Sequence, residues 1–576
     1  MRVRFEEFLF DDDRRELMRS FPLRQGENLL GRGEDADVRV GLAGVSRLHA
    51  RITVSGDRAT IEDLGSKNGT FVDEAEIGRA AGLRDGAILR LGVGRRLIGR
   101  WRVLPRRTGP RRPGGRPGGA LGATPATVSA VDVDGSPHSH ASQPGDRPPG
   151  EPDAAVWEGV DLEQLARSTP TPFFLFSEAR LGENLDGLRS GLTASGLPVR
   201  LRYCAKANGE LAILQILAAA GLDVLVSHAA EGELALRAGF PPQRMALQKP
   251  VLTAADAAWA VQRRVGLVHA CREQDLDTLA AAAAATGHAP AVSLRVGGDA
   301  HGSPLAFANR RLGVSRRQAL RLGTGFRRWA PLRLRALNCY IGTQQTGTAG
   351  FRQAIARLCR LAVELRQEGV EVEELNLGGG APSPTMRRLA PGRLLSRWRD
   401  VEAGEQRPSV ESFARRLGEI VAAAWRRHDL DATALALEPG RSLVGDAAVL
   451  VTRVAAVDRG WLFLDVSRNV LGESSLLLRR RVLPLRPRAG KSRYYHLSGG
   501  TLNTMDVLDL HRRLPPMEVG DLLLFADAGA YSLSRAARYG GLSPAALLRR
   551  ASGEIVTVRR AETLDDLTGP MVPLPR

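Results

Sequence analysis

The chain has 576 residues, and its hydrophobic fraction of 43% and charged fraction of 25% exclude a fibrous or wholly disordered protein. The formal net charge is +18, but basic residues are spread along the chain without an aromatic-interleaved stripe, so nucleic-acid binding is not expected. With no signal segment at the amino terminus and no apolar run of membrane-spanning length, we expect a cytoplasmic protein with no membrane partner.

The four cysteines show neither a CxxC pair nor the spacing of metal ligands. They are Cys204, Cys271, Cys339 and Cys359. This usage is typical of reduced thiols in a cytoplasm, so neither a disulfide nor a metal site is predicted.

Residues 1–104 contain short strand-like segments separated by turns, which is the pattern of an all-β sandwich. The predicted strands are 28–30, 38–40, 49–54, 59–63, 70–72 and 87–91. The turns carry three polar motifs, Gly31-Arg32, Ser46-Arg47-Leu48-His49 and Lys67-Asn68-Gly69-Thr70. Charged forks and hydroxyl or amide donors that converge from loops are what recognition of a phosphate requires.

These three motifs together, across about residues 21–104, resemble a forkhead-associated (FHA) domain. The resemblance implies a module that binds phosphothreonine peptides. In such a module Arg32, Ser46 and Arg47 would hold the phosphate. Asn68 would bind the peptide backbone, with help from Lys67. The alternative is an FHA fold that has lost peptide binding.

Residues 105–155 are rich in Pro, Gly, Arg, Ser and His and poor in large apolar side chains. Such a composition cannot bury enough surface to offset the entropy of ordering, so we predict a disordered linker. The linker contains Thr108, Thr124 and Thr127, so the phosphothreonine partner is either another protein or this linker itself.

Residues 156–440 alternate short apolar runs with helical stretches, which predicts a (β/α)8 TIM barrel better than an open sheet. The eight predicted strands are 201–204, 224–226, 245–247, 267–270, 292–296, 335–340, 374–377 and 434–437. From 441 onward strands predominate, so residues 441–576 are predicted to form a β-domain that completes the active site. The fold class is therefore multidomain.

Lys206 is one of only four lysines, although lysine and arginine together number 81. A guanidinium stays protonated and cannot attack a carbonyl, whereas a lysine amine can lose its proton and form a Schiff base. Lys206 follows the first predicted barrel strand, at the end of the barrel where such folds carry out their chemistry. We therefore predict a catalytic lysine rather than a surface lysine that happened to persist.

Four motifs occur in order through the barrel and the β-domain. They are Tyr203-Cys204-Ala205-Lys206-Ala207-Asn208, Leu377-Gly378-Gly379-Gly380, Glu438-Pro439-Gly440-Arg441 and Gly529-Ala530-Tyr531. Together they resemble the fold-type III enzymes dependent on pyridoxal phosphate, specifically the ornithine/diaminopimelate/arginine decarboxylase group with its alanine racemase-like barrel. The resemblance covers about residues 170–541 and implies pyridoxal 5'-phosphate as cofactor, an amino acid as substrate and a homodimer.

The resemblance also implies roles for individual residues. The implied cofactor-binding residues are Lys206, Tyr340, Gly378, Gly379, Gly380, Glu438, Arg441 and Tyr531. Lys206 would form the Schiff base, and the three glycines would offer unobstructed backbone N–H groups to the phosphate. Arg441 and Tyr531 would lie at the phosphate. Glu438 would pair with the pyridine nitrogen and so strengthen the electron sink that loss of CO2 requires.

The chain departs from the family at several positions. Tyr340 stands where the family has a histidine that stacks on the cofactor ring, and tyrosine can also stack. Leu502 and Asn503 stand where the family has a catalytic cysteine and an acidic substrate-binding residue. Without that acidic side chain, the enzyme lacks the carboxylate that would bind the distal ammonium group of lysine, ornithine or diaminopimelate. These substrates are therefore less expected. Asn503 and Asp506 remain as candidate substrate-binding residues. Ser475 stands near the position of a family arginine that binds the substrate carboxylate, and the neighbouring Arg479, Arg480 and Arg481 are candidates to compensate for it.

The leading interpretation is an amino-acid decarboxylase joined to a phosphothreonine-binding module. A racemase or epimerase is the alternative within the same cofactor class, because the missing thiol implies altered proton return. A third alternative is a catalytically inactive scaffold that binds pyridoxal phosphate and whose main role is phosphopeptide binding.

Overall fold

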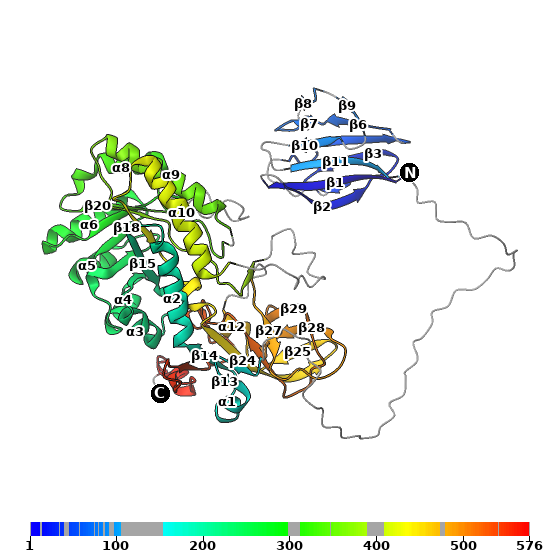
Figure 1. The fold of residues 1–576 in the computed structure, drawn as a ribbon. Coiled ribbons are helices and arrows are strands. Elements are labelled where there is room, and N and C mark those ends of the chain that lie inside the picture. Colours follow the sequence, from blue (N-terminus) through cyan, green and yellow to red (C-terminus); the bar gives the residue numbers. More distant parts are fainter. Residues whose placement is uncertain are drawn as a thin grey trace, which may run out of the picture. The chain divides into compact units, whose positions relative to one another are not determined.

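The chain folds into two compact units, Met1–Gly145 and Asp146–Arg576 (Figure 1). The computed structural model describes residues 2–11, 14–33, 35–39, 45–56, 58–73, 75–78, 80–84, 87–91, 97–104, 154–297, 312–345, 347–388, 408–472, 478–539 and 541–574. The predicted linker at 105–155 lies outside the described residues except for Ala154 and Ala155. Its three threonines therefore also lie outside them.

The amino-terminal unit is a sandwich of two sheets, as predicted. One sheet has the order β2 (Arg14–Pro22), β1 (Arg2–Asp11), β11 (Leu97–Leu104), β10 (Ile88–Leu91), β7 (Thr70–Val72) and β8 (Ala75–Glu76). The other has the order β4 (Val38–Arg39), β3 (Gly26–Gly31), β5 (Ala50–Ser55), β6 (Arg58–Asp63) and β9 (Ala80–Leu83). Ala50, Ile52 and Val54 alternate along β5 and are all buried, because successive side chains of a strand point to opposite faces.

The hairpin of β1 and β2 adds two strands that the sequence pattern did not predict. β1 pairs antiparallel with β11, from Arg2 opposite Leu104 to Leu9 opposite Leu97. Charged residues interrupt the alternation of residues 2–22, which hides these strands in the sequence.

The carboxy-terminal unit contains a closed barrel of eight parallel strands, which confirms the eight predicted strands. They are β15 (Val199–Cys204), β16 (Asp223–Val226), β17 (Met245–Gln248), β18 (Leu267–Ala270), β19 (Ala291–Arg295), β20 (Arg333–Asn338), β21 (Glu374–Asn376) and β23 (Ala434–Leu437). Helices surround the barrel, namely α2 (Glu178–Thr193), α3 (Leu211–Ala219), α4 (Ala229–Arg237), α5 (Ala254–Gln262), α6 (Glu273–Thr286), α8 (Arg316–Thr324), α9 (Ala349–Gln367) and α10 (Val410–His428). Short 3-10 turns lie at η1 (Ala205–Ala207), η2 (Pro242–Arg244) and η3 (Phe326–Trp329).

Local sequence signals determine where these helices begin. Thr253 and Asp256 form a reciprocal capping box at the start of α5, in which each side chain accepts a hydrogen bond from the backbone of the other. Ser315 and Gln318 do the same for α8. At Gly191 of α2 a Cβ would lie only 2.5 Å from the backbone oxygen of Glu411, so this glycine allows α2 to pack closely on α10.

A nine-stranded sheet forms the core of the β-domain. Its strands are β29 (Val507–Leu514), β28 (Arg493–Ser498), β25 (Trp461–Leu464), β24 (Ala448–Asp458), β14 (Phe173–Ser177), β31 (Ala545–Arg549) and β32 (Ile555–Arg559), with β30 (Leu522–Phe525) beside β24 and β27 (Val482–Pro484) beside β30. β14 precedes the barrel in the chain, yet it pairs antiparallel with β24 and parallel with β31. All five of its residues are buried, and periodicity cannot show which sheet such a strand joins.

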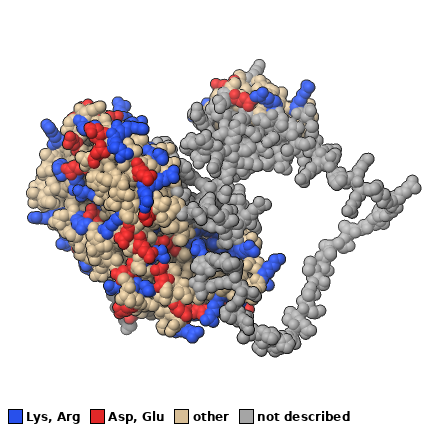
Figure 2. All heavy atoms as spheres, in the orientation of Figure 1, with Lys and Arg blue, Asp and Glu red and all other residues tan. Residues whose placement is uncertain are grey.

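Shorter elements complete the carboxy-terminal unit. They are β12 (Val156–Trp157), β13 (Val160–Asp161), β22 (Arg387–Arg388), β26 (Leu478–Arg479), α1 (Leu162–Ser168), α11 (Arg441–Val444), α12 (Arg468–Leu471), η5 (Leu533–Arg535) and α13 (Leu564–Thr568). On the face of this unit shown in Figure 2, basic and acidic side chains are interspersed. Within the described part of the chain, no helix is both long enough and apolar enough to cross a membrane.

Candidate functional site

Lys206 lies at the carboxyl end of the first barrel strand, in the turn η1 that follows β15. Ala205 and Ala207 on either side are buried, whereas the lysine is exposed to a cavity of about 590 Å³. Glu231, Tyr340, Thr343, Tyr531 and Arg535 also line this cavity, with Glu210 and Arg559 paired 2.8 Å apart at its wall. The structure therefore directs the amine into an open space at the chemically active end of the barrel.

Hydrogen bonds to the β-domain fix the turn that carries Lys206. The Tyr531 backbone N–H donates to the Ala207 oxygen at 2.7 Å, and the Ser534 hydroxyl donates to the same oxygen at 3.2 Å. Asn208 is buried, and its side-chain amide donates to the Gly529 oxygen at 2.9 Å. The Gly-Ala-Tyr motif is thus joined directly to the lysine motif, although more than 300 residues separate them: Asn208 and Gly529 are 321 residues apart.

Glu438 lies buried where the last barrel strand, β23, ends. The Asn376 amide donates to its Oε1 at 2.7 Å, and the Asn338 amide donates to the same oxygen at 3.4 Å. The His269 ring nitrogen Nε2 lies 3.4 Å from that oxygen. Both amide donors therefore engage one oxygen of the carboxylate, Oε1.

Burial dominates the electrostatics around this carboxylate. It raises the pKa of Glu438, and the Asn376 hydrogen bond together with the charges of Arg202 and Lys206 opposes that shift. Burial, reinforced by nearby arginines, lowers the pKa of His269 well below its usual range, so this imidazole is neutral at physiological pH. Interaction with Cys204, and then with Glu438, raises the pKa of Lys206 in spite of its desolvation. The amine must therefore release a proton before it attacks a carbonyl.

The triple-glycine loop follows β21 and packs against neighbouring backbone. Gly378 and Gly380 have φ values of 68° and 112°, which disfavour other residues, and a Cβ at either would lie 2.5 Å from a backbone oxygen. The Gly378 N–H donates to Oδ1 of Asn376 at 2.7 Å. Of the three predicted phosphate donors, Gly378 therefore already has an internal acceptor, and Gly379 and Gly380 stay as predicted donors.

Arg441 follows the same turn as Glu438 and is almost completely buried. Its guanidinium lies 4.9 Å from the centre of the Tyr531 ring. The Pro439 oxygen accepts a hydrogen bond of 3.0 Å from Cys204 N, so this turn is joined to the lysine motif. The structure thus brings together an amine, a carboxylate, a glycine loop and an arginine, which fit the aldehyde, the ring nitrogen and the phosphate of a phosphorylated pyridine cofactor.

In the amino-terminal unit the predicted phosphopeptide residues converge from three loops. Arg32 N donates to the Ser46 oxygen at 3.0 Å, and Lys67 N donates to the Ser46 hydroxyl at 3.1 Å. Arg32, Arg47 and Lys67 are exposed, and Asn68 is half-buried in the third loop. Cationic and hydroxyl groups therefore face solvent together at one edge of the sandwich.

His49 holds these loops in place from below. It is completely buried, its Nδ1 accepts from Ser46 N at 3.0 Å, and its Nε2 contacts the Gly69 oxygen at 3.1 Å. Burial lowers the pKa of His49, which keeps the ring neutral with the proton on Nε2 for Gly69. Asp63 organises the third loop by accepting hydrogen bonds from Ser66 and Thr70.

Comparison with known proteins agrees with both sites. Residues 28–92 match the FHA domain, and residues 187–445 match the pyridoxal-binding domain of pyridoxal-dependent decarboxylases. The chain joins an FHA domain to a pyridoxal-dependent decarboxylase domain. The cofactor of the decarboxylase domain is accordingly pyridoxal phosphate.

Similar proteins of known name include diaminopimelate decarboxylases. Over 426 residues the chain is 27% identical to the diaminopimelate decarboxylase of Vibrio cholerae, a match that spans 72% of this chain and 96% of that protein. It is 29% identical over 420 residues to the enzyme of the same name from Pseudomonas aeruginosa, spanning 71% of this chain and 95% of that protein.

Solved structures show the same fold. The crystal structure of diaminopimelate decarboxylase from M. jannaschi has a TM-score of 0.64 at 22% identity and covers 73% of this chain and 96% of that one. The lysine decarboxylase from Selenomonas ruminantium has a TM-score of 0.58 at 24% identity and covers 69% of this chain and 97% of that one.

The segment 499–506 carries two of the predicted departures from the family, Leu502 and Asn503. Leu502 is fully exposed at its tip, and neither Asn503 nor Asp506 lines the cavity beside Lys206 in the same chain. Asp506 is buried and accepts hydrogen bonds from Arg468 N and from both the N–H and the hydroxyl of Thr501. These bonds give Asp506 a role in shaping the loop, and its predicted contact with substrate stays a prediction.

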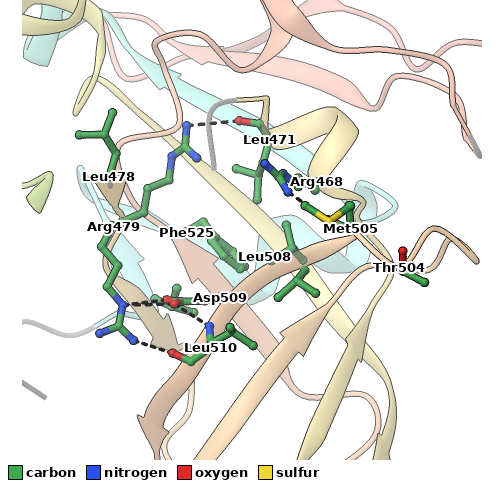
Figure 3. A pocket seen from close by; sticks show the side chains of 13 residues that line it. Arg468, Leu471, Leu478, Arg479, Thr504, Met505, Leu508, Asp509, Leu510 and Phe525 are labelled. Carbon is green, nitrogen blue, oxygen red and sulfur yellow. Dashed lines mark hydrogen bonds and ion pairs between the residues drawn. The ribbon is translucent and has the colours of Figure 1, made fainter. Parts of the chain in front are cut away.

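A second cavity, of about 230 Å³, lies beside this segment in the β-domain of the decarboxylase (Figure 3). Two of the candidate compensating arginines line it. Arg479 donates to Asp509 at 3.2 Å and to the Leu510 oxygen at 3.0 Å, and Arg480 donates to the Leu471 oxygen at 3.2 Å. Both guanidinium groups therefore already donate hydrogen bonds to acceptors within the chain, which is typical of arginines that stabilise the fold.

Sequence reasoning missed Asn376 and Asn338, the two amides that hold Glu438. Each is the last residue of a barrel strand, β21 or β20, and each is buried. A polar residue that ends a barrel strand was the available signal, because such residues face the active site.

Proposed function

We propose that this protein is a pyridoxal-phosphate-dependent amino-acid decarboxylase whose FHA domain binds a phosphothreonine-containing protein. The observation that carries the enzymatic half is that Lys206 and a buried, amide-held Glu438 lie at the same end of the barrel, each directly after a barrel strand. When bound, pyridoxal phosphate supplies an electron sink for the electron pair left by the departing carboxyl group.

Each of the predicted cofactor-binding residues would have a separate role. Lys206 would hold the cofactor through Nζ. Glu438 would keep a proton on the ring nitrogen, while Asn376 prevents the carboxylate from turning away. Gly379, Gly380 and Arg441 would bind the phosphate and so orient the ring.

The substrate we propose is an amino acid without a distal ammonium group. The relatives are named for diaminopimelate, but Asn503 offers an amide where an acidic residue would pair with such a group. An amide leaves a desolvated ammonium without a counter-charge, which is costly. Because the Leu502 side chain has no proton to give, we propose that Lys206 Nζ returns a proton to the substrate carbon.

The test is a panel of L-amino acids on the cofactor-loaded full chain, with CO2 release and chirality both recorded. CO2 release supports the proposal, chirality change without CO2 identifies a racemase, and neither reaction with any amino acid identifies a scaffold. Lys206→Ala should abolish turnover and the visible absorbance that the cofactor acquires on binding a lysine amine. Lys491→Ala is the control, because Lys491 is exposed and distant in sequence from every motif. Equal absorbance in Lys206→Ala and Lys491→Ala would exclude Lys206 as the attachment point.

The FHA half of the proposal is supported by the convergence of Arg32, Ser46 and Lys67 at one edge of the sandwich. Calorimetric titration with phosphothreonine peptides, including peptides of the chain's own 105–153 segment, tests it. Ser46→Ala should remove a hydroxyl donor and weaken binding about ten-fold or more. Arg58→Ala, an exposed arginine at the start of β6, is the matched control. Equal affinity for phosphorylated and unmodified peptides would count against this role.

We also propose a homodimer in the cytoplasm. Leu502 and Met505 are exposed together on one loop, which is unusual for apolar side chains that remain in water. All four cysteines are free and buried, as suits a reducing compartment. Light scattering on the purified chain measures the mass directly, and a monomer at micromolar concentration would exclude the dimer.

A further inference from the structure

A second charged cavity lies at the opposite end of the barrel from Lys206. It measures about 480 Å³ and opens among the amino-terminal ends of the barrel strands. Its charged lining is Arg189, Arg200, Arg202, Asp223, Arg244 and Arg335. Arg200 precedes Lys206 by six residues along an extended strand and turn, so the two sites are about 20 Å apart.

Two guanidinium groups contact one buried carboxylate in this cavity, and a third lies in the same lining without an ion pair to the described residues. Arg202 and Glu374 are both almost fully buried and form two parallel hydrogen bonds of 2.7 Å. Arg200 approaches the same carboxylate at 3.7 Å. The Arg335 side chain, on β20, makes no ion pair with the described residues, and its Nε is buried without an acceptor. One carboxylate already saturated by Arg202 cannot also satisfy Arg335.

The other residues that line the cavity do not balance the positive charge of Arg200 and Arg335. Arg244 pairs with Asp223 at 2.7 Å, which leaves that pair neutral. Arg189 donates to the Ala220 backbone oxygen at 2.6 Å, a neutral acceptor. Counting Glu374 with the lining, five arginines face two carboxylates, so the cavity has an excess of three positive charges.

The arginine-rich composition of the chain does not by itself explain this cluster. Arg333 lies two residues before Arg335 on the same strand and pairs with Glu373 at 2.9 Å, outside the cavity. Burial lowers the pKa of Arg335, and the neighbouring charges of Arg202 and Arg200 add to this shift, which Glu374 opposes. An uncompensated, partly buried cation lowers stability unless an anion completes its environment.

We propose that this cavity binds a phosphate-bearing small molecule, with the phosphate held by Arg335 and Arg200 against the Arg202–Glu374 pair. Arginine forks match the oxygens of a phosphate, and a dianion would balance most of the charge excess. The cavity volume exceeds that of inorganic phosphate, so it also accommodates the organic part of a phosphorylated metabolite. The site is separate from the cofactor pocket and from the FHA loops.

Inorganic phosphate and AMP are the probes, titrated into the full chain at constant ionic strength set with chloride. The protein is loaded with pyridoxal phosphate, freed of unbound cofactor so that none competes for the cavity, and carries Ser46→Ala to reduce uptake of the probe by the FHA loops. We expect saturable binding that Arg335→Met weakens about ten-fold or more, because a charge-assisted pair is lost. Arg333→Met on the same strand should leave it unchanged. Tighter binding of AMP than of phosphate identifies a phosphorylated metabolite as the occupant, and equal binding identifies free phosphate.

A structural role for Arg335 predicts different results. If Arg335 only supports the fold, Arg335→Met lowers the Tm of the ligand-free protein, whereas our proposal expects an unchanged or higher Tm. Arg200→Met provides a second variant, since Arg200 is half-exposed and its replacement should not impair folding. No saturable binding of either probe, or undiminished binding in both variants, would overturn the proposal.

Discussion

Asn376 joins Glu438 to the glycine loop: its amide nitrogen donates to Glu438 Oε1 at 2.7 Å and its Oδ1 accepts from Gly378 N at 2.7 Å. One buried side chain therefore positions both the carboxylate for the cofactor ring and the loop for the cofactor phosphate. The two residues that it connects are 60 positions apart in the sequence, Gly378 and Glu438.

Asn376→Ala should weaken both halves of the cofactor site at once. A buried hydrogen bond to a charged group contributes about 1.5–3 kcal/mol, so we expect about a ten- to 100-fold loss in cofactor affinity. Equilibrium binding of pyridoxal phosphate, followed by absorbance, measures this. Asn469→Ala, which removes only a bond to the Tyr539 oxygen in the β-domain, is the control. Equal cofactor affinity in both variants would contradict the positioning role.

Gly380→Ala should impair cofactor binding through backbone strain. Its φ of 112° disfavours a side chain, and the added Cβ would lie 2.5 Å from the Gly342 oxygen. Gly182→Ala in α2 is the matched control, because nothing lies within 4 Å of its added Cβ and alanine favours a helix by about 0.5–1 kcal/mol. We expect a large fall in cofactor affinity for the first variant and an unchanged or slightly raised Tm for the second.

Asp446→Asn should alter the pH dependence of stability. Burial, with the charge of Asp527, raises the pKa of Asp446 to about 6. A carboxyl group whose folded pKa is raised binds its proton more tightly in the folded state. Its stabilising contribution is complete below the unfolded pKa of 3.8 and is lost as the pH rises through about 6.

The loss corresponds to about 2–3 kcal/mol across that window. Chemical denaturation of the wild type and of Asp446→Asn from pH 4 to about pH 7 measures it. The variant retains an oxygen that can accept from Asn184, so its stability should vary less over this range. Asp431→Asn, at an exposed aspartate, should follow the wild type.

His49→Ala should weaken phosphopeptide binding although His49 does not face the peptide. The buried ring holds Ser46 N and the Gly69 oxygen, so its loss releases two of the three binding loops. We expect a destabilisation of about 1–3 kcal/mol together with a fall in peptide affinity. Thermal unfolding and calorimetric titration of the full chain measure the two effects. A loss of stability with full peptide affinity would show that the ring serves the fold alone.

The double variant Leu502→Cys, Asn503→Glu tests whether segment 499–506 determines the substrate. It introduces a thiol and a carboxylate at the positions where the family resemblance implies them. If the segment reaches a partner's active site, the variant should gain CO2 release from diaminopimelate or lysine. Unchanged specificity would separate this loop from substrate recognition.

Much of the architecture follows from local pattern. The eight barrel strands are short and apolar with helical stretches between them, so their positions are readable in the sequence, and Lys206 is recognisable because it follows one of them. The FHA loops are recognisable because turns need particular residues at particular spacings. The hairpin of residues 2–22 was missed, because charges interrupt its alternation.

The sequence by itself determined the two folds, the cofactor lysine and the turn motifs, because periodicity and turn chemistry act between near neighbours in the chain. Only the tertiary structure decided that β14 joins the β-domain sheet, that Asn376 holds Glu438, and that Asp506 is engaged within its own loop. It alone also brought Arg200 and Arg335 around Glu374. Burial and hydrogen-bond partnership depend on residues far apart in the chain, and strand order in a closed barrel is what brings them together.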